Sequence, residues 1–105
     1  MTRYIGVDLH TNSLTVCYLE SEDNMRFKTY QLTKAGLNCF KQSLKPEDKI
    51  AVEATGNTEF FVDAIESKVF SVSIVNPSQF DVIRKSVSKT DKNDARALAF
   101  YLSKD

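Results

Sequence analysis

Three segments in the first third of the chain alternate in the manner of β-strands. Residues 3–9 form a short apolar run, residues 14–19 alternate with both faces largely apolar, and residues 26–32 alternate again. Polar, turn-like residues separate them, so we expect an antiparallel meander with short links. The two apolar faces of the second segment predict a strand that is covered on both sides.

The spacing of apolar residues then changes to that of helices alternating with strands. Thr33 is suited to cap the first helix, Asn76 and Pro77 favour the start of a later one, and Thr90 or Asp91 favours the start of the last. The predicted elements are a helix with Leu37, Phe40 and Leu44, a strand at 49–53, a helix with Phe60, Phe61, Ala64 and Ile65, a strand at 69–75, a helix with Phe80 and Ile83, and a helix with Ala95, Leu98, Ala99 and Leu102.

This order, βββαβαβαα, predicts an α/β fold of the ribonuclease H-like kind, in which a mixed five-stranded sheet is flanked by helices. The length of 105 residues is that of one domain. The chain ends at Asp105, directly after an apolar helix that has no evident cap. We therefore interpret residues 1–105 as the N-terminal fragment of a longer protein.

The composition adds few constraints. The formal net charge is zero, which gives no support to nucleic-acid binding, and no run of apolar residues is long enough for a membrane span. The absence of a leader predicts a cytoplasmic protein. Cys17 and Cys39 lie within apolar patterns and lack metal-site spacing, so we expect reduced thiols of the core type, with a disulfide as the alternative.

Four carboxylates carry the candidate chemistry. Asp8 and Glu53 each end an apolar strand segment, and Asp91 and Asp94 are three residues apart in the last predicted helix. In a ribonuclease H-like sheet the first and fourth strands are adjacent, and adjacent strands lie about 4.8 Å apart. Asp8 and Glu53 could therefore share one ion, which Asp91 and Asp94 would approach from the helix.

Such a cluster favours a bound metal. Two like charges at about 4 Å repel by about 4 kcal/mol at an effective dielectric constant of 20. A divalent cation is the simplest compensation, and oxygen-only ligands favour Mg²⁺ or Mn²⁺ over Zn²⁺. Each acid also has a plainer interpretation: Asp8 as the start of a turn, Glu53 as a solvated strand end, and Asp91 and Asp94 as a cap and first-turn acid.

Several other residues allow two interpretations. His10 is either a turn residue or a group that orients a phosphate or leaving group. The cations near the last acids are either a solvated face or contacts to a nucleic-acid backbone; they are Arg84, Lys85, Lys89, Lys92 and Arg96. The segment 55–57 is either a plain helix entry or a place where Gly56 permits close approach to a substrate.

Taken together, four motifs resemble a known family over nearly the whole chain. They are IGVDLHTNSLTVCYL, VEATGN, VNPSQF and KTDKNDARALA. They are similar to the N-terminal domain of the DEDD-type insertion-sequence transposases, which are RuvC-like recombinases guided by a bridge RNA. The four acidic positions of that family correspond to Asp8, Glu53, Asp91 and Asp94.

The resemblance implies a RuvC-like fold and Mg²⁺- or Mn²⁺-dependent DNA strand cleavage and exchange during transposition. It implies DNA and a guide RNA as partners, a homo-oligomeric full-length protein in a prokaryotic cytoplasm, and no membrane. It also implies that a C-terminal domain outside these 105 residues supplies a nucleophilic serine. The isolated fragment is then expected to be inactive or weakly active.

Three alternatives remain open on the residues alone. One is a metal-dependent nuclease of the Holliday-junction type, without serine chemistry. Another is a fragment of an actin-like or sugar-kinase-type ATPase, whose first strand also carries the pattern of Gly6-Val7-Asp8, although His10 stands where that fold favours glycine. The third is a non-catalytic RNA- or protein-binding module of the same fold.

Overall fold

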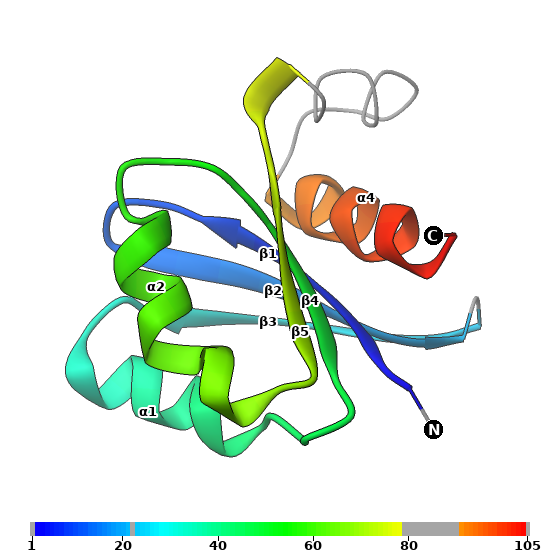
Figure 1. Ribbon diagram of the computed structural model, residues 1–105, viewed down its shortest axis with the longest axis horizontal. Coiled ribbons are helices and arrows are strands. Elements are labelled where there is room, and N and C mark those ends of the chain that lie inside the picture. The colour runs from blue at the N-terminus through cyan, green and yellow to red at the C-terminus, as the bar shows by residue number, and fades with distance from the viewer. Residues whose placement is uncertain (1, 22, 79–90, 105) are drawn as a thin grey trace.

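A mixed five-stranded sheet in the order β3-β2-β1-β4-β5 forms the centre of the molecule (Figure 1). The computed structural model describes residues 2–21, 23–78 and 91–104, and for residues 91–93 it describes the backbone only. The strands are β1 (Tyr4–Leu9), β2 (Ser13–Ser21), β3 (Asn24–Gln31), β4 (Lys49–Glu53) and β5 (Ser71–Val75). The first three form the expected antiparallel meander, and β4 and β5 run parallel to β1.

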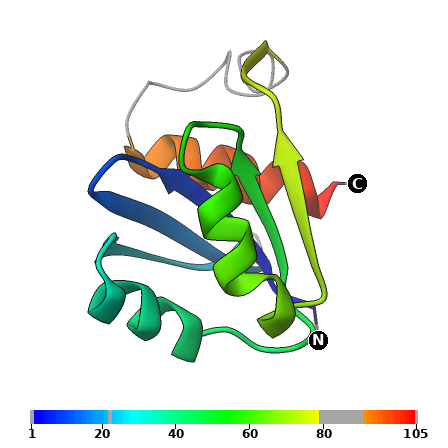
Figure 2. The same cartoon turned by 60° about the vertical axis from the view of Figure 1, so that its left-hand side comes forward.

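Helices cover both faces of this sheet. One face carries α1 (Lys34–Gln42) and α2 (Thr58–Ile65), which a 3₁₀ turn (Glu66–Lys68) extends, and the other carries α4 (Asp91–Ser103) (Figures 1 and 2). The predicted cap of α1 is confirmed, because the Thr33 hydroxyl accepts a hydrogen bond from the Gly36 amide at 3.1 Å. The two-sided cover also confirms that β2 is buried on both faces between Leu14 and Leu19.

The larger apolar core lies between the sheet and the helices α1 and α2. Alternate residues of the strands point into it, and the rings of Phe40 and Phe61 stack there at 5.8 Å between centroids. The side chains that are wholly buried in it include Ile5, Val7, Leu14, Val16, Ile50, Val52 and Ile65. Because side chains alternate along a strand, the residues of β1 and β4 that do not enter this core lie on the opposite face of the sheet, beneath α4.

The α4 face is packed with both leucines and small residues. Ala95, Leu98, Ala99 and Leu102 are buried against the sheet, as the sequence pattern predicts. A β-carbon at Gly6 would overlap the backbone carbonyl of Ala95 and crowd the amide of Ala99. The helix backbone therefore lies directly on β1, at a point where glycine leaves room for it.

At the start of β1 the fold contains a buried ion pair, which we call the paired end. The Arg3 guanidinium donates to both carboxylate oxygens of Asp48, at 3.1 and 2.7 Å, and to the Ser43 carbonyl at 2.6 Å. Asp48 is fully buried and also accepts from the Lys45 amide at 2.8 Å. Burial alone would lower the pKa of Arg3, but the hydrogen bonds and charge of Asp48 outweigh it and raise that pKa.

Three expectations need comment. Cys17 is buried but Cys39 is exposed, so the prediction of two core-type thiols is wrong for Cys39; both cysteines are free. The reason is that α1 turns Leu37 and Phe40 inward, which leaves Cys39 on its outer side. Phe60 is 61% exposed, although the helix that it helped to predict is present.

The helix predicted from Asn76 onward can be followed only at its start. Pro77 and Ser78 are helical, and the remainder, with Phe80 and Ile83, lies outside the described residues. Among the helices that the structure describes, none is long and apolar enough to cross a membrane.

Candidate metal centre

Asp8 and Glu53 come together through the pairing of β1 and β4. Val7 is opposite Val52 in the parallel ladder, so the next residue of each strand, Asp8 or Glu53, stands at the same level. Val7 and Val52 point into the core beneath α1 and α2. Because successive side chains of a strand point to opposite faces, both carboxylates lie on the α4 face, at the carboxyl ends of adjacent strands.

Helix α4 brings a third acid to the same end of the sheet. Ala95 lies over Gly6, whereas Phe100 and Ser103 lie near Tyr4, so α4 runs antiparallel to β1. Its first turns are therefore at the Asp8 end. Asp94 directly precedes Ala95 and is only 7% exposed. We call the region that carries Asp8, Glu53 and Asp94 the acidic end.

Asp91 is the first residue of α4, and its side chain lies outside the described part of the structure. The backbone places it three residues before Asp94 in a continuous helix. Positions three apart are neighbours on a helix surface. Asp91 and Asp94 therefore lie in one helix, as their spacing of three residues predicts.

His10 is in direct contact with the first acid. Its Nε2 lies 2.9 Å from Oδ2 of Asp8, and the Asp8 side chain is 9% exposed where that of His10 is 40% exposed. The His10 backbone amide also donates to the Ser13 carbonyl at 2.8 Å, which closes the turn between β1 and β2. The turn thus fixes the backbone of His10, and the His10 ring contacts one carboxylate oxygen of Asp8.

A network of hydrogen bonds fixes the turn that follows Glu53. The Thr58 hydroxyl donates to the Glu53 carbonyl at 3.1 Å and accepts from the Thr55 amide at 2.6 Å. The Ala54 amide donates to the Val75 carbonyl at 2.7 Å and continues the ladder with β5. Glu53 is therefore held at a defined position rather than on a loose strand end.

The chemistry of this donor set fits a hard divalent cation. Asp8, Glu53 and Asp94 offer only carboxylate oxygens, the ligands that Mg²⁺ and Mn²⁺ prefer. Among the described side chains, which exclude that of Asp91, no three acidic, histidine or cysteine groups are close enough to form a complete ligand set. The structure thus places the described acids at one end of one face without closing a metal site.

The cations predicted to contact nucleic acid are for the most part outside the described region. Arg84, Lys85 and Lys89 fall in residues 79–90, and the side chain of Lys92 is likewise not described. Arg96 is exposed on α4, with its guanidinium carbon 5.7 Å from the centre of the Phe100 ring.

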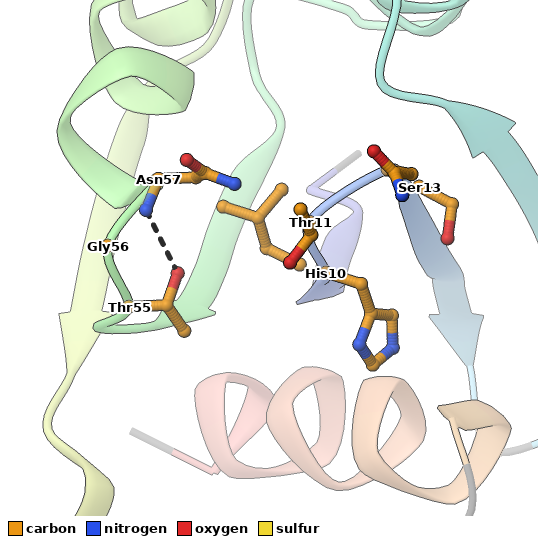
Figure 3. Close-up of a pocket in the computed structure, with 8 residues that line it drawn as sticks. His10, Thr11, Ser13, Thr55, Gly56 and Asn57 are labelled. Carbon is orange, nitrogen blue, oxygen red and sulfur yellow. Dashed lines mark hydrogen bonds between the residues drawn. The ribbon is translucent and has the colours of Figure 1, made fainter.

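A hollow of about 650 Å³ opens beside the acidic end, between the turn after β1 and the turn after β4 (Figure 3). Polar side chains make up most of its lining, which consists of Leu9, His10, Thr11, Asn12, Ser13, Thr55, Gly56 and Asn57. The sequence had indicated His10 and the segment 55–57, but not Thr11, Asn12 or Ser13. The available signal was that each segment follows a strand with an acid at its last or second-last residue.

The contact between Asp8 and His10 was also missed. Residues two apart share a face in extended backbone, and His10 directly follows β1, so the spacing of the two residues contained this signal.

Comparison with known proteins agrees with this architecture. The structure of RuvC from Thermus thermophilus is similar, with a TM-score of 0.53 and 15% sequence identity over 93% of this chain and 89% of that chain. At this level of identity the similarity establishes a RuvC-like fold. No individually curated protein matches the chain.

The family model for transposases of the DEDD, IS110 type matches residues 5–105. The chain belongs to this transposase family. The motif resemblance and the RuvC-like, ribonuclease H-like fold predicted from the sequence are thereby confirmed.

Proposed function

We propose that this chain is the metal-binding catalytic domain of a DNA transposase, and that it takes part in strand cleavage and exchange when an insertion sequence moves. Asp8, Glu53, Asp91 and Asp94 would hold Mg²⁺ or Mn²⁺. The proposal rests on membership of the transposase family and on the arrangement of the acidic end.

One observation carries the most weight. Asp8 and Glu53 stand side by side on adjacent parallel strands and share the face on which the buried Asp94 lies. A fold gains no stability from gathering like charges, because each close pair repels. Carboxyl ends of parallel strands are also where open α/β sheets bind their ligands. The acidic end is therefore better explained by a bound cation than by packing.

The residues of the chain would have separate roles. Asp8 and Glu53 bind from the sheet and Asp94 and Asp91 from α4, and His10 orients Asp8 through the contact at 2.9 Å. When bound, the cation would neutralise charge that develops on the phosphate under attack. Gly6, by admitting the backbone of α4, sets the separation between the two groups of acids.

The remaining parts of the proposal concern partners. The substrate would be DNA, selected with the help of a guide RNA, in a homo-oligomer of the full-length protein. Residues 1–105 would be the N-terminal domain, and a C-terminal domain would supply a serine that attacks the DNA. These assignments follow from the motif resemblance and the family, and they make strand cleavage a property of the combined domains.

Metal binding by site-directed variants tests the proposal. We expect the chain to bind Mn²⁺, measured by electron paramagnetic resonance, and Asp8→Asn or Glu53→Gln to weaken binding by about tenfold or more, because each removes one charged ligand. Asp63→Asn is a matched control, since Asp63 is an exposed acid on α2.

Equal binding by Asp8→Asn, Asp63→Asn and the unaltered chain would contradict the metal site. In the full-length transposase, the same Asp8→Asn change should abolish cleavage of donor DNA while Asp63→Asn leaves it intact.

A further inference from the structure

Gly56 has no structural reason to be a glycine. Its φ is not positive, so the backbone there is open to any residue. A β-carbon built on it would have no atom within 4 Å, whereas one at Gly6 or Gly36 would overlap backbone atoms. The fold thus requires two of its three glycines and leaves the third unexplained.

Gly56 is one of the residues that line the hollow beside the acidic end. Gly56 lines this hollow from the turn after β4, opposite Thr11 in the turn after β1 (Figure 3). The turn that carries Gly56 is held by the Thr55–Thr58 hydrogen bond at 2.6 Å. We therefore expect a larger residue at position 56 to reduce the space in the hollow without disturbing the turn.

The chemistry of the lining indicates what the hollow accepts. It offers hydroxyls and amides from both turns, and among its described lining residues His10 is the only ionisable one and none is aromatic. Hydroxyl and amide donors of this kind hold phosphate and sugar oxygens in protein–nucleic acid complexes. Bases of a single strand are instead held by stacking on aromatic side chains, which this lining lacks.

We propose that the hollow between residues 10–13 and 55–57 is a subsite for the sugar–phosphate backbone of a nucleic-acid strand, and that Gly56 is the residue that keeps it open. The strand lies against the backbone of the turn after β4 and passes from there to the acidic end, because His10 lines the hollow and contacts Asp8. The inference rests on the proposed function, since it places the substrate of that same site. It assigns to Gly56 a positioning role that does not depend on base sequence.

A series of side chains at position 56 tests this subsite. With Ca²⁺ present, we expect the affinity of the chain for short labelled DNA and RNA oligonucleotides, measured by fluorescence anisotropy, to fall through Gly56→Ala to Gly56→Gln. Gly56→Gln should raise Kd by about tenfold, a change of about 1.4 kcal/mol. Oligonucleotides of different sequence should lose affinity by the same factor, and a loss confined to DNA or to RNA would identify the occupant.

Ser67→Gln is the matched control, because it adds an equal side chain at an exposed position in the 3₁₀ turn after α2. It should bind as the unaltered chain does, and both variants should keep their thermal unfolding midpoint. Unchanged binding by Gly56→Gln, a loss that depends on base sequence, or no nucleic-acid binding by the unaltered chain would each overturn the proposal.

Measuring Mn²⁺ affinity in the same variants tests the metal site independently of the nucleic-acid subsite. Gly56→Gln should leave it unchanged, because Gly56 offers no ligand. Loss of Mn²⁺ binding in Asp8→Asn together with normal nucleic-acid binding in Gly56→Gln would support the metal site and contradict the subsite. Normal Mn²⁺ binding in Asp8→Asn together with weakened nucleic-acid binding in Gly56→Gln would support the subsite and contradict the metal site.

Discussion

The two ends of the sheet handle acidic side chains in opposite ways. At the paired end one carboxylate, Asp48, is fully buried and meets Arg3 in a two-point contact, with a backbone amide in addition. At the acidic end three described carboxylates lie on one face, and the His10 ring is in contact with one of them, Asp8. At the paired end the carboxylate is matched by a cation of the fold, whereas the acidic end brings several carboxylates to one face of the sheet.

Under the proposed function, this difference separates charges that serve structure from charges that would serve binding. Asp48 is not suited to bind a ligand or ion, since its oxygens already accept three hydrogen bonds from Arg3 and Lys45. The acidic end lies where the parallel strands end and beside an open polar hollow. Removing charge should therefore cost much more stability at the paired end than at the acidic end.

The largest effect is expected at the paired end. Arg3→Met leaves Asp48 buried without its counter-charge, and breaking a buried pair in this way destabilises proteins by about 3–5 kcal/mol. Urea unfolding measures it. The double variant Arg3→Met/Asp48→Leu should recover much of the loss, and if it recovers nothing, the pair is not the cause.

Metal should stabilise the acidic end by a somewhat smaller amount. A ligand that binds only the folded chain stabilises it by about 2.7 kcal/mol when present at a hundred times its Kd. Mg²⁺ should therefore raise the thermal unfolding midpoint of the unaltered chain and of Asp63→Asn equally, and that of Asp8→Asn by clearly less. Equal shifts in all three would show that Mg²⁺ acts elsewhere.

Gly6→Ala should disturb the acidic end while it leaves the paired end intact. The added carbon forces α4 away from β1, and overpacking of this kind destabilises by about 1–3 kcal/mol. Because α4 carries Asp94, Mn²⁺ affinity should fall as well. Gly56→Ala is the control, since a β-carbon there meets no atom within 4 Å; a similar loss in both variants would contradict the account of α4.

Without metal, Asp8→Asn should change stability by less than about 1 kcal/mol, because lost contact with His10 and relieved repulsion from Glu53 act in opposite directions. Chemical denaturation in a chelating buffer measures this. A loss as large as that of Arg3→Met would show that both ends are structural.

The smallest effect concerns the two thiols. Burial raises the pKa of Cys17 from its ordinary 9.0 to about 11, and nearby Arg96 opposes this shift. A thiol whose pKa is raised by folding contributes stability below the pKa that it has when unfolded, and this is lost as pH rises through about 11. A thiol reagent near neutral pH should modify exposed Cys39 in the native chain and Cys17 only after unfolding; fast modification of Cys17 would contradict its burial.

Sequence reasoning was most successful where regular strand geometry determines which residues are neighbours. Asp8 and Glu53 could be placed together because strand order and side-chain alternation are regular. The Arg3–Asp48 pair gave no such signal, since its partners are 45 residues apart in the chain. The close approach of α4 at Gly6 and the exposure of Cys39 depend on how a helix is rotated against a sheet, which spacing alone does not determine.

The placement of α4 on Gly6 also affects the order of folding. Ala95 and Gly6 lie at opposite ends of the sequence, so their contact closes a loop that is nearly as long as the chain, whereas the hairpin of β1 and β2 closes a short one. We expect the strands and α1 to assemble first and α4 to dock last. The repulsion between Asp94 and the acids of the sheet would then arise in that final step, where a cation that joins them would speed docking and slow its reversal.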